Sequence, residues 1–144
     1  MIPDVNVLVA AFRDDHVQFG IAAPWLRQVR ERTLAGDTNL VLLPLVLAGF
    51  LRLVTNRRVF ANPNSPEEAV AFIDALLASP GVVIRDGEVW PLLRSKLLAL
   101  DLRGNDVNDA WIAAAVEAAG EQLVTFDRGF RRLLAARDLI LLPA

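Results

Sequence analysis

Aspartates are the side chains of this chain best placed to do chemistry. The sequence contains one histidine, His16, and neither cysteine nor tyrosine, so the usual pairs of nucleophile and general base are nearly excluded. His16 lies in a charged turn with Arg13, Asp14 and Asp15, and we expect it to face solvent rather than to act as a base. The remaining candidates are carboxylates that stand at the ends of predicted elements.

Three aspartates stand where a parallel α/β unit places its active edge. Asp4 follows a strand stub at residues 1–3 and precedes an apolar helical run, while Asp109 lies near the start of an Ala-rich helix. Asp127 directly follows an apolar strand at residues 123–126. Because strands end and helices begin at the same edge of a parallel sheet, the three carboxylates are predicted to face one crevice.

Such a group of carboxylates suits a hard divalent cation, Mg²⁺ or Mn²⁺. The ion polarises a phosphate and activates water, and without it the acids would repel each other. Each acid also has a structural explanation: Asp4 as a helix cap, Asp109 in a first helical turn and Asp127 as the start of a turn. Those explanations account for each position singly but not for the shared edge, so a metal site is predicted.

Strands and helices alternate from end to end, which predicts an α/β fold with a mainly parallel sheet and one domain over residues 1–144. Ser65 is the expected cap of one helix, with Glu68 closing a capping box, and Pro24 is expected in the first turn of another. In the helix at 87–100, the inner face is expected to carry Trp90, Leu93, Leu97 and Leu98. The expected strands are 1–3, 40–43, 82–84, 123–126 and 139–142, and the expected helices are 5–12, 21–34, 44–55, 66–78, 87–100, the Ala-rich segment after 106, and 130–136.

Composition favours a compact protein in the cytoplasm. The chain is 54% hydrophobic with a mean hydropathy of +0.39, which is typical of a globular core. Its longest apolar run, 40–51, is broken by Pro44 and Gly49 and is shorter than the roughly 20 residues of a membrane-spanning helix. Asp4 stands where a secretory signal carries positive charge, and the lack of cysteine fits a reducing compartment.

Arginine is concentrated in two places although the net charge is −2. Lys96 is the only lysine among 15 basic residues, and arginines gather at 52–58 and 128–132. Arginine contacts phosphate through two parallel hydrogen bonds, so Arg52, Arg128 and Arg131 are candidate contacts for an RNA backbone. The alternative is that they only solubilise an apolar chain. Arg128 has the stronger functional case because it follows Asp127 directly.

Four segments together resemble the PIN-domain ribonucleases, in particular the VapC-type toxins of bacterial toxin–antitoxin pairs. The segments DVNVLVAAF, VNDAWIAA and TFDRGF resemble the three motifs of that family, and FLRLVTNRRVF is similar to a further segment of the VapC group. Each motif alone is weak, because an aspartate after a short strand is common. Their order, spacing and reach across nearly the whole chain make the resemblance specific.

The resemblance implies a three-layer α/β/α domain that acts as a metal-dependent endoribonuclease and as the toxin of such a pair. It implies that Asp4, Asp109 and Asp127 are the catalytic residues and the ligands of Mg²⁺ or Mn²⁺. Asn6, Asn105 and Thr125 match polar positions of the motifs, where they would orient the acids or a water. The implied partners are RNA, a VapB-like antitoxin and a second copy of the chain.

Two glycines depart from the family pattern. Gly49 stands where VapC-like proteins usually carry a glutamate, and Gly129 stands where the last motif often has a second aspartate. Asp106 lies one helical turn before Asp109 and is a candidate replacement. The number of metal ions therefore stays open, as does the alternative of a catalytically weakened PIN domain that binds RNA or an antitoxin. Gly49 has a second explanation, the close approach of another helix or of the substrate.

Overall fold

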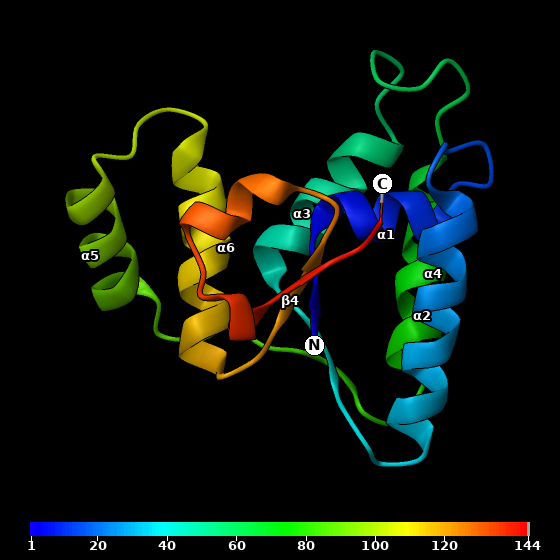
Figure 1. Ribbon diagram of the computed structural model, residues 1–144. Helices are drawn as coiled ribbons and strands as arrows, with labels where there is room; N and C mark the ends of the chain where they lie inside the picture. Colours follow the sequence, from blue (N-terminus) through cyan, green and yellow to red (C-terminus); the bar gives the residue numbers. More distant parts are fainter. Residues whose placement is uncertain (144) are drawn as a thin grey trace.

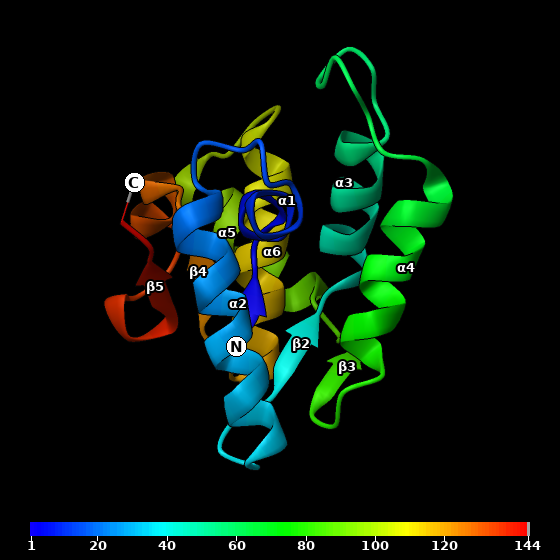
Figure 2. The same ribbon diagram turned by 90° about the vertical axis from the view of Figure 1, so that its right-hand side faces the viewer.

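Five short parallel strands form the middle layer of the fold. The computed structural model describes residues 1–143, so Ala144, the last residue of the predicted domain, lies outside the described residues. Two parallel sheets, β1-β4-β5 and β2-β3, are joined by the Val41 N–H, which donates to the Met1 carbonyl at 2.8 Å. The spatial order is therefore β3-β2-β1-β4-β5 (Figure 2). The strands are β1 (Ile2–Pro3), β2 (Leu40–Leu42), β3 (Val82–Ile84), β4 (Leu123–Thr125) and β5 (Leu139–Leu141).

Helices cover both faces of this sheet. In Figure 1, α5 and α6 lie on one side of the strands, and α1, α2 and α4 lie on the other. The chain crosses from β1 through β2 to β3 in one direction and then returns to β4, and right-handed crossovers place the returning helices on the opposite face. The predicted three-layer α/β/α class is confirmed. The helices are α1 (Val5–Phe12), α2 (Phe19–Leu34), α3 (Pro44–Val54), α4 (Pro66–Leu77), α5 (Trp90–Leu100) and α6 (Asp106–Ala119).

Burial explains why the central strands read as continuous apolar runs. Every residue of β2 and β4 is buried, as expected for parallel strands with helices on both faces. At the edge strand β3, Val83 and Ile84 are exposed. The expected capping box of α4 is also present, because the Glu68 N–H donates to Ser65 Oγ and the Ser65 N–H donates to Glu68 Oε1, both at 3.1 Å.

An aromatic cluster fixes α1 against the neighbouring helices. The Phe12 ring at the end of α1 lies with its centroid 5.4 Å from that of Phe50 in α3 and 4.8 Å from that of Phe72 in α4. Phe50 is fully buried. The cluster sets the position of α1, whose first turn follows Asp4, relative to α3, which carries Arg52.

Three expectations about helices are wrong. Helix α2 begins at Phe19, so Pro24 lies in its second turn rather than its first. The segment 130–136 forms two short 3₁₀ turns, η1 (Arg128–Arg132) and η2 (Ala136–Asp138), because Ala135 is extended and interrupts it. Helix α5 is an outer helix that packs on α6 (Figure 1), so it buries a narrow stripe at Leu93 and leaves Trp90 and Leu98 exposed.

None of the helices formed by residues 1–143 has the length and apolar character needed to cross a bilayer.

Candidate metal centre

The candidate site lies where the strand order reverses. Strands β1 and β4 are neighbours, but the chain leaves them toward opposite faces of the sheet, and such switch points open a crevice at the carboxyl ends of the strands. Asp4 follows β1 directly, Asp127 lies two residues after β4, and Asp109 comes from the first turn of α6. All three carboxylates line one pocket of about 410 Å³, hereafter the acid pocket.

Asp4 forms the buried floor of the acid pocket. The Thr125 hydroxyl donates to Asp4 Oδ2 and the Val5 N–H donates to Asp4 Oδ1, both at 2.7 Å. Thr125 is fully buried, and its oxygen accepts the Asp127 N–H at 3.0 Å. A single threonine therefore connects the Asp4 side chain to the backbone of Asp127.

The three acids differ in exposure. Asp4 is buried, Asp109 is half-buried and Asp127 is exposed at the rim. One oxygen of Asp127, Oδ1, accepts the Gly129 N–H at 2.8 Å. A Cβ at Gly129 would lie 3.0 Å from the same Oδ1, so an aspartate at 129 would crowd the acid that is already there.

Burial and mutual repulsion act on the acids in the same direction. Burial is the main cause that raises the pKa of Asp4, the charge of Asp127 adds to it, and the bonds from Thr125 and Val5 oppose it. For Asp109, burial again comes first in raising the pKa, followed by the negative charges of Asp4, Asp127 and Asp106. The carboxylates are therefore close enough to sense each other's charge.

These shifts predict an unusual pH dependence for the metal-free protein. Asp4 and Asp109 have a higher pKa in the folded state than the value of about 3.8 expected in the unfolded state. Above pH 3.8 the folded state therefore binds more protons than the unfolded state, so the free energy of unfolding falls as pH rises. We expect the melting temperature in EDTA to decrease as pH rises from about 4 through the raised pKa values of Asp4 and Asp109. Saturating Mn²⁺ should remove this decrease. Thermal melts across pH with and without the ion measure it, and a stability in EDTA that rises over this window would contradict it.

The donor chemistry fits a divalent cation. Within the described residues, no group of three His, Asp or Glu side chains is drawn together closely enough to hold an ion as it stands. Asn6 also lines the acid pocket, and its buried Oδ1 atom has no hydrogen-bond partner. A buried oxygen without a partner beside three carboxylates is the type of oxygen-rich surrounding that Mg²⁺ and Mn²⁺ prefer.

The other predicted residues divide between the pocket and its surroundings. Arg52, at the end of α3, lines the acid pocket. Asn105 precedes α6 without capping it through its side chain, and Asp106 forms an ion pair with Arg132 at 2.7 Å. Arg128 is exposed next to Asp127, whereas Arg131 lines a separate hollow beside β5. Neither Asn105 nor Asp106 lines the acid pocket, but the negative charge of Asp106 contributes to the raised pKa of Asp109.

Two polar residues of the pocket were missed by the sequence analysis. His16 lies in the expected turn but is half-buried and lines the acid pocket, and its Nδ1 accepts the Gln18 N–H at 3.1 Å, so it is less exposed than expected. Asn108 also lines the pocket. Asn108 could have been predicted as a site residue, because it directly precedes Asp109 within the segment VNDAWIAA. No local pattern marks His16.

Comparison with known proteins identifies the family. The family model described as PIN domain matches residues 1–134. The chain belongs to the PIN-domain family. Within it the chain groups with the VapC proteins: ribonuclease VapC43 of Mycobacterium tuberculosis is 42% identical over 139 residues, which cover 93% of this chain and 90% of that protein.

Solved structures agree with this assignment at the level of fold. VapBC2 from Rickettsia felis, solved bound to a DNA fragment from its promoter, contains a chain that matches with a TM-score of 0.65 at 19% identity. The match covers 97% of this chain and 95% of that one. VapC20 of Mycobacterium tuberculosis, described as a Sarcin-Ricin loop cleaving toxin, matches with a TM-score of 0.57 at 19% identity, over 90% of this PIN domain and 92% of that chain.

Proposed function

We propose that this PIN domain is a metal-dependent endoribonuclease and the toxin of a toxin–antitoxin pair. The observation that carries the proposal is the convergence of Asp4, Asp109 and Asp127 on one pocket at the switch point of the sheet. The VapC proteins that it is similar to are named ribonucleases, which supports the same activity. RNA is the proposed substrate.

In this proposal the three aspartates hold Mg²⁺ or Mn²⁺. The bound ion would polarise the scissile phosphate and activate the attacking water. Thr125 keeps Asp4 in place through its 2.7 Å hydrogen bond, and Asn6, whose Oδ1 has no hydrogen-bond partner, lines the same pocket. Arg52 lines the pocket on the side of α3 and has no ion-pair partner among the described residues, so its guanidinium is available to a phosphate.

A VapB-like antitoxin is the proposed protein partner, and a homodimer is the proposed assembly. The structural match to a VapBC2 complex supports the first of these. Co-purification of the chain with the product of the neighbouring small reading frame tests it. Sedimentation of the isolated chain tests the second.

The alternative is a PIN domain that binds RNA or the antitoxin without cutting. The observation that favours it is Gly49, which stands where the VapC pattern has an acid. A cleavage assay on structured and single-stranded RNAs, titrated with Mg²⁺, with Mn²⁺ and with EDTA, separates the two functions. Cleavage that follows metal occupancy supports the nuclease. Metal-independent binding without any cleavage product would support the alternative.

The arginines of the two clusters should differ in their effect on RNA binding. Arg52→Ala is expected to weaken binding and to lower the slope of log affinity against log salt by about one, because one fewer phosphate is neutralised. Arg131→Ala serves as the matched comparison, because Arg131 lines the separate hollow beside β5. Fluorescence anisotropy over a series of salt concentrations gives both slopes. If Arg131→Ala changed the slope and Arg52→Ala did not, the RNA backbone would have to bind at the hollow beside β5 instead.

A further inference from the structure

The wall of the acid pocket opposite the carboxylates is apolar and aromatic. Leu53 from α3 and Val59 and Phe60 from the loop that follows it form this wall, with His16 beside them. A phosphate and a metal ion require no apolar surface. A nucleotide does, because it carries a flat base next to its charged phosphate.

Phe60 lines the acid pocket and has an arginine over its ring. The guanidinium carbon of Arg13 lies 3.9 Å from the centroid of the Phe60 ring. Arg13 does not line the acid pocket but a neighbouring hollow of about 640 Å³, whereas Phe60 lines the acid pocket and not that hollow. The contact between Arg13 and Phe60 therefore joins the linings of the two hollows, and Arg13 occupies one face of the ring.

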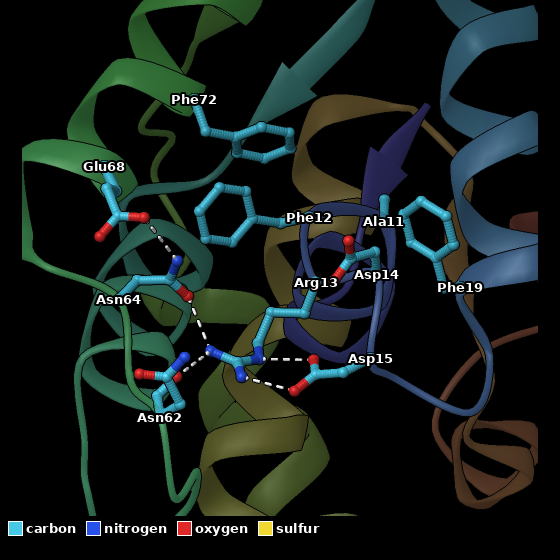
Figure 3. Close-up of a pocket in the computed structure, with 10 residues that line it drawn as sticks. All are labelled: Ala11, Phe12, Arg13, Asp14, Asp15, Phe19, Asn62, Asn64, Glu68 and Phe72. Carbon is cyan, nitrogen blue, oxygen red and sulfur yellow. Dashed lines mark hydrogen bonds and ion pairs between the residues drawn. The ribbon is translucent and has the colours of Figure 1, made fainter.

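Arg13 is fixed by bonds to protein groups (Figure 3). It is 8% exposed, and its Nε and Nη2 donate to the two carboxylate oxygens of Asp15 at 2.9 and 2.7 Å. Its Nη1 donates to the Asn62 carbonyl at 3.1 Å and to Asn64 Oδ1 at 2.9 Å. These bonds tie the end of α1 to the loop 56–64, which carries Phe60, and hold the guanidinium in a fixed position over the ring.

We propose that Phe60 is a stacking platform for one base of the RNA substrate, next to the scissile phosphate at the acid pocket. Arg13 is the positioning residue for this platform. The proposal rests on the proposed function for the position of the phosphate. Its substrate class is RNA with an unpaired base, because a base within a duplex is already stacked on both sides and cannot lie on a protein ring.

The test uses the full chain and a short single-stranded RNA that carries one 2-aminopurine, whose fluorescence falls when the base stacks. Binding is measured in Ca²⁺ in place of Mg²⁺, and the RNA is checked afterwards to be intact. We expect Phe60→Leu, which keeps an apolar side chain but removes the ring, to bind about ten-fold more weakly and to lose the quenching. Phe60→Tyr should retain both. Trp90→Leu, on the exposed surface of α5, is the matched control and should bind as wild type.

The same RNA with an abasic site in place of the 2-aminopurine gives the second comparison. Wild type and Phe60→Leu are expected to bind this probe equally, because no base is left at the position that would stack on the ring. If Phe60→Leu kept wild-type affinity and quenching for the base-containing probe, the platform would be overturned. Cleavage in Mg²⁺ or Mn²⁺ is recorded separately. Base-dependent binding without cleavage would reject the proposed nuclease activity but support the stacking platform. Cleavage without base-dependent binding would support the nuclease activity but reject the platform.

The role of Arg13 is tested with Arg13→Lys, which keeps the charge but has no planar group to lay against the ring. We expect reduced quenching with Phe60 intact, and a KM raised about three-fold or more while kcat changes little, as for a loss of uniform substrate binding. A variant with a lowered melting temperature but wild-type quenching and KM would make Arg13 a structural residue only. Circular dichroism confirms that each variant is folded.

Discussion

Replacing Asp4, Asp109 or Asp127 singly by asparagine is expected to lower RNA cleavage by at least about a hundredfold. Each substitution removes one negative charge from the acid pocket with almost no change in volume, so the loss reports on ion binding and not on packing. Cleavage rates at saturating Mn²⁺ and metal affinity by calorimetry measure it. Asp74→Asn, an exposed position on α4, is the matched control and should cleave as wild type.

The same variants should differ in stability in a way that separates the three acids. Asp109→Asn is expected to raise the melting temperature in EDTA, because it removes a half-buried charge whose pKa is raised by burial and by Asp4, Asp127 and Asp106. Asp4→Asn should gain less. Its oxygens accept from the Thr125 hydroxyl and from the Val5 N–H, and an amide at this position can accept through only one atom.

Two outcomes would contradict this account. Wild-type cleavage in two of the three variants would show that the carboxylates do not share one site. A lower melting temperature of Asp109→Asn in EDTA would show that repulsion among the acids is too weak to matter. In the second case only the cleavage data would support the proposed metal site.

The position of the acids could be predicted from the sequence because it follows from parallel topology. An aspartate two residues after the buried strand β4 and another directly after the stub β1 come close together when these strands are neighbours. The opposite wall of the pocket could not be predicted in the same way. Its Phe60 is fixed by Arg13 through bonds to residues 62 and 64, about 50 positions along the chain, and no local pattern encodes such a contact.

Helix α5 shows a second limit of periodicity. Its apolar residues recur with helical spacing, and the sequence analysis placed four of them in the core. Only Leu93 is buried, because a helix at the outside of a layer has one neighbour and needs one narrow stripe. Hydrophobic spacing identifies the helix correctly, but it cannot decide how much of the apolar side meets a partner.

Gly49 is the departure from the family pattern that the structure helps to explain. A Cβ built at this buried position would lie 2.8 Å from Val5 Cγ2 and 3.4 Å from Val5 Cγ1. Helices α1 and α3 therefore approach each other through the missing side chain, and Gly49 itself does not line the acid pocket. Of its two explanations, close approach of a helix is the one that these contacts favour over a lost metal ligand.

Gly49→Glu is therefore expected to lower the free energy of unfolding by about 3 kcal/mol, because it overpacks the contact with Val5 and buries a carboxylate. Mn²⁺ affinity, measured by calorimetric titration, should not increase. Gly49→Ala isolates the clash: the gain of about 1 kcal/mol in helix propensity should be outweighed by overpacking, because the branched Val5 side chain cannot turn away freely. Tighter Mn²⁺ binding by Gly49→Glu at an unchanged melting temperature would instead restore the lost-ligand explanation.

A double-mutant cycle with Val5→Ala identifies the cause of the destabilisation. If the contact between the two side chains is responsible, the double variant Val5→Ala, Gly49→Ala should be more stable than the sum of the single effects implies, by about 1 kcal/mol. Additive effects would place the strain elsewhere in α3. Because Val5 follows Asp4 directly and lines the acid pocket, Gly49→Ala should also displace the floor of the site. We therefore expect its cleavage rate to fall at unchanged carboxylate content, and to recover in the double variant together with stability.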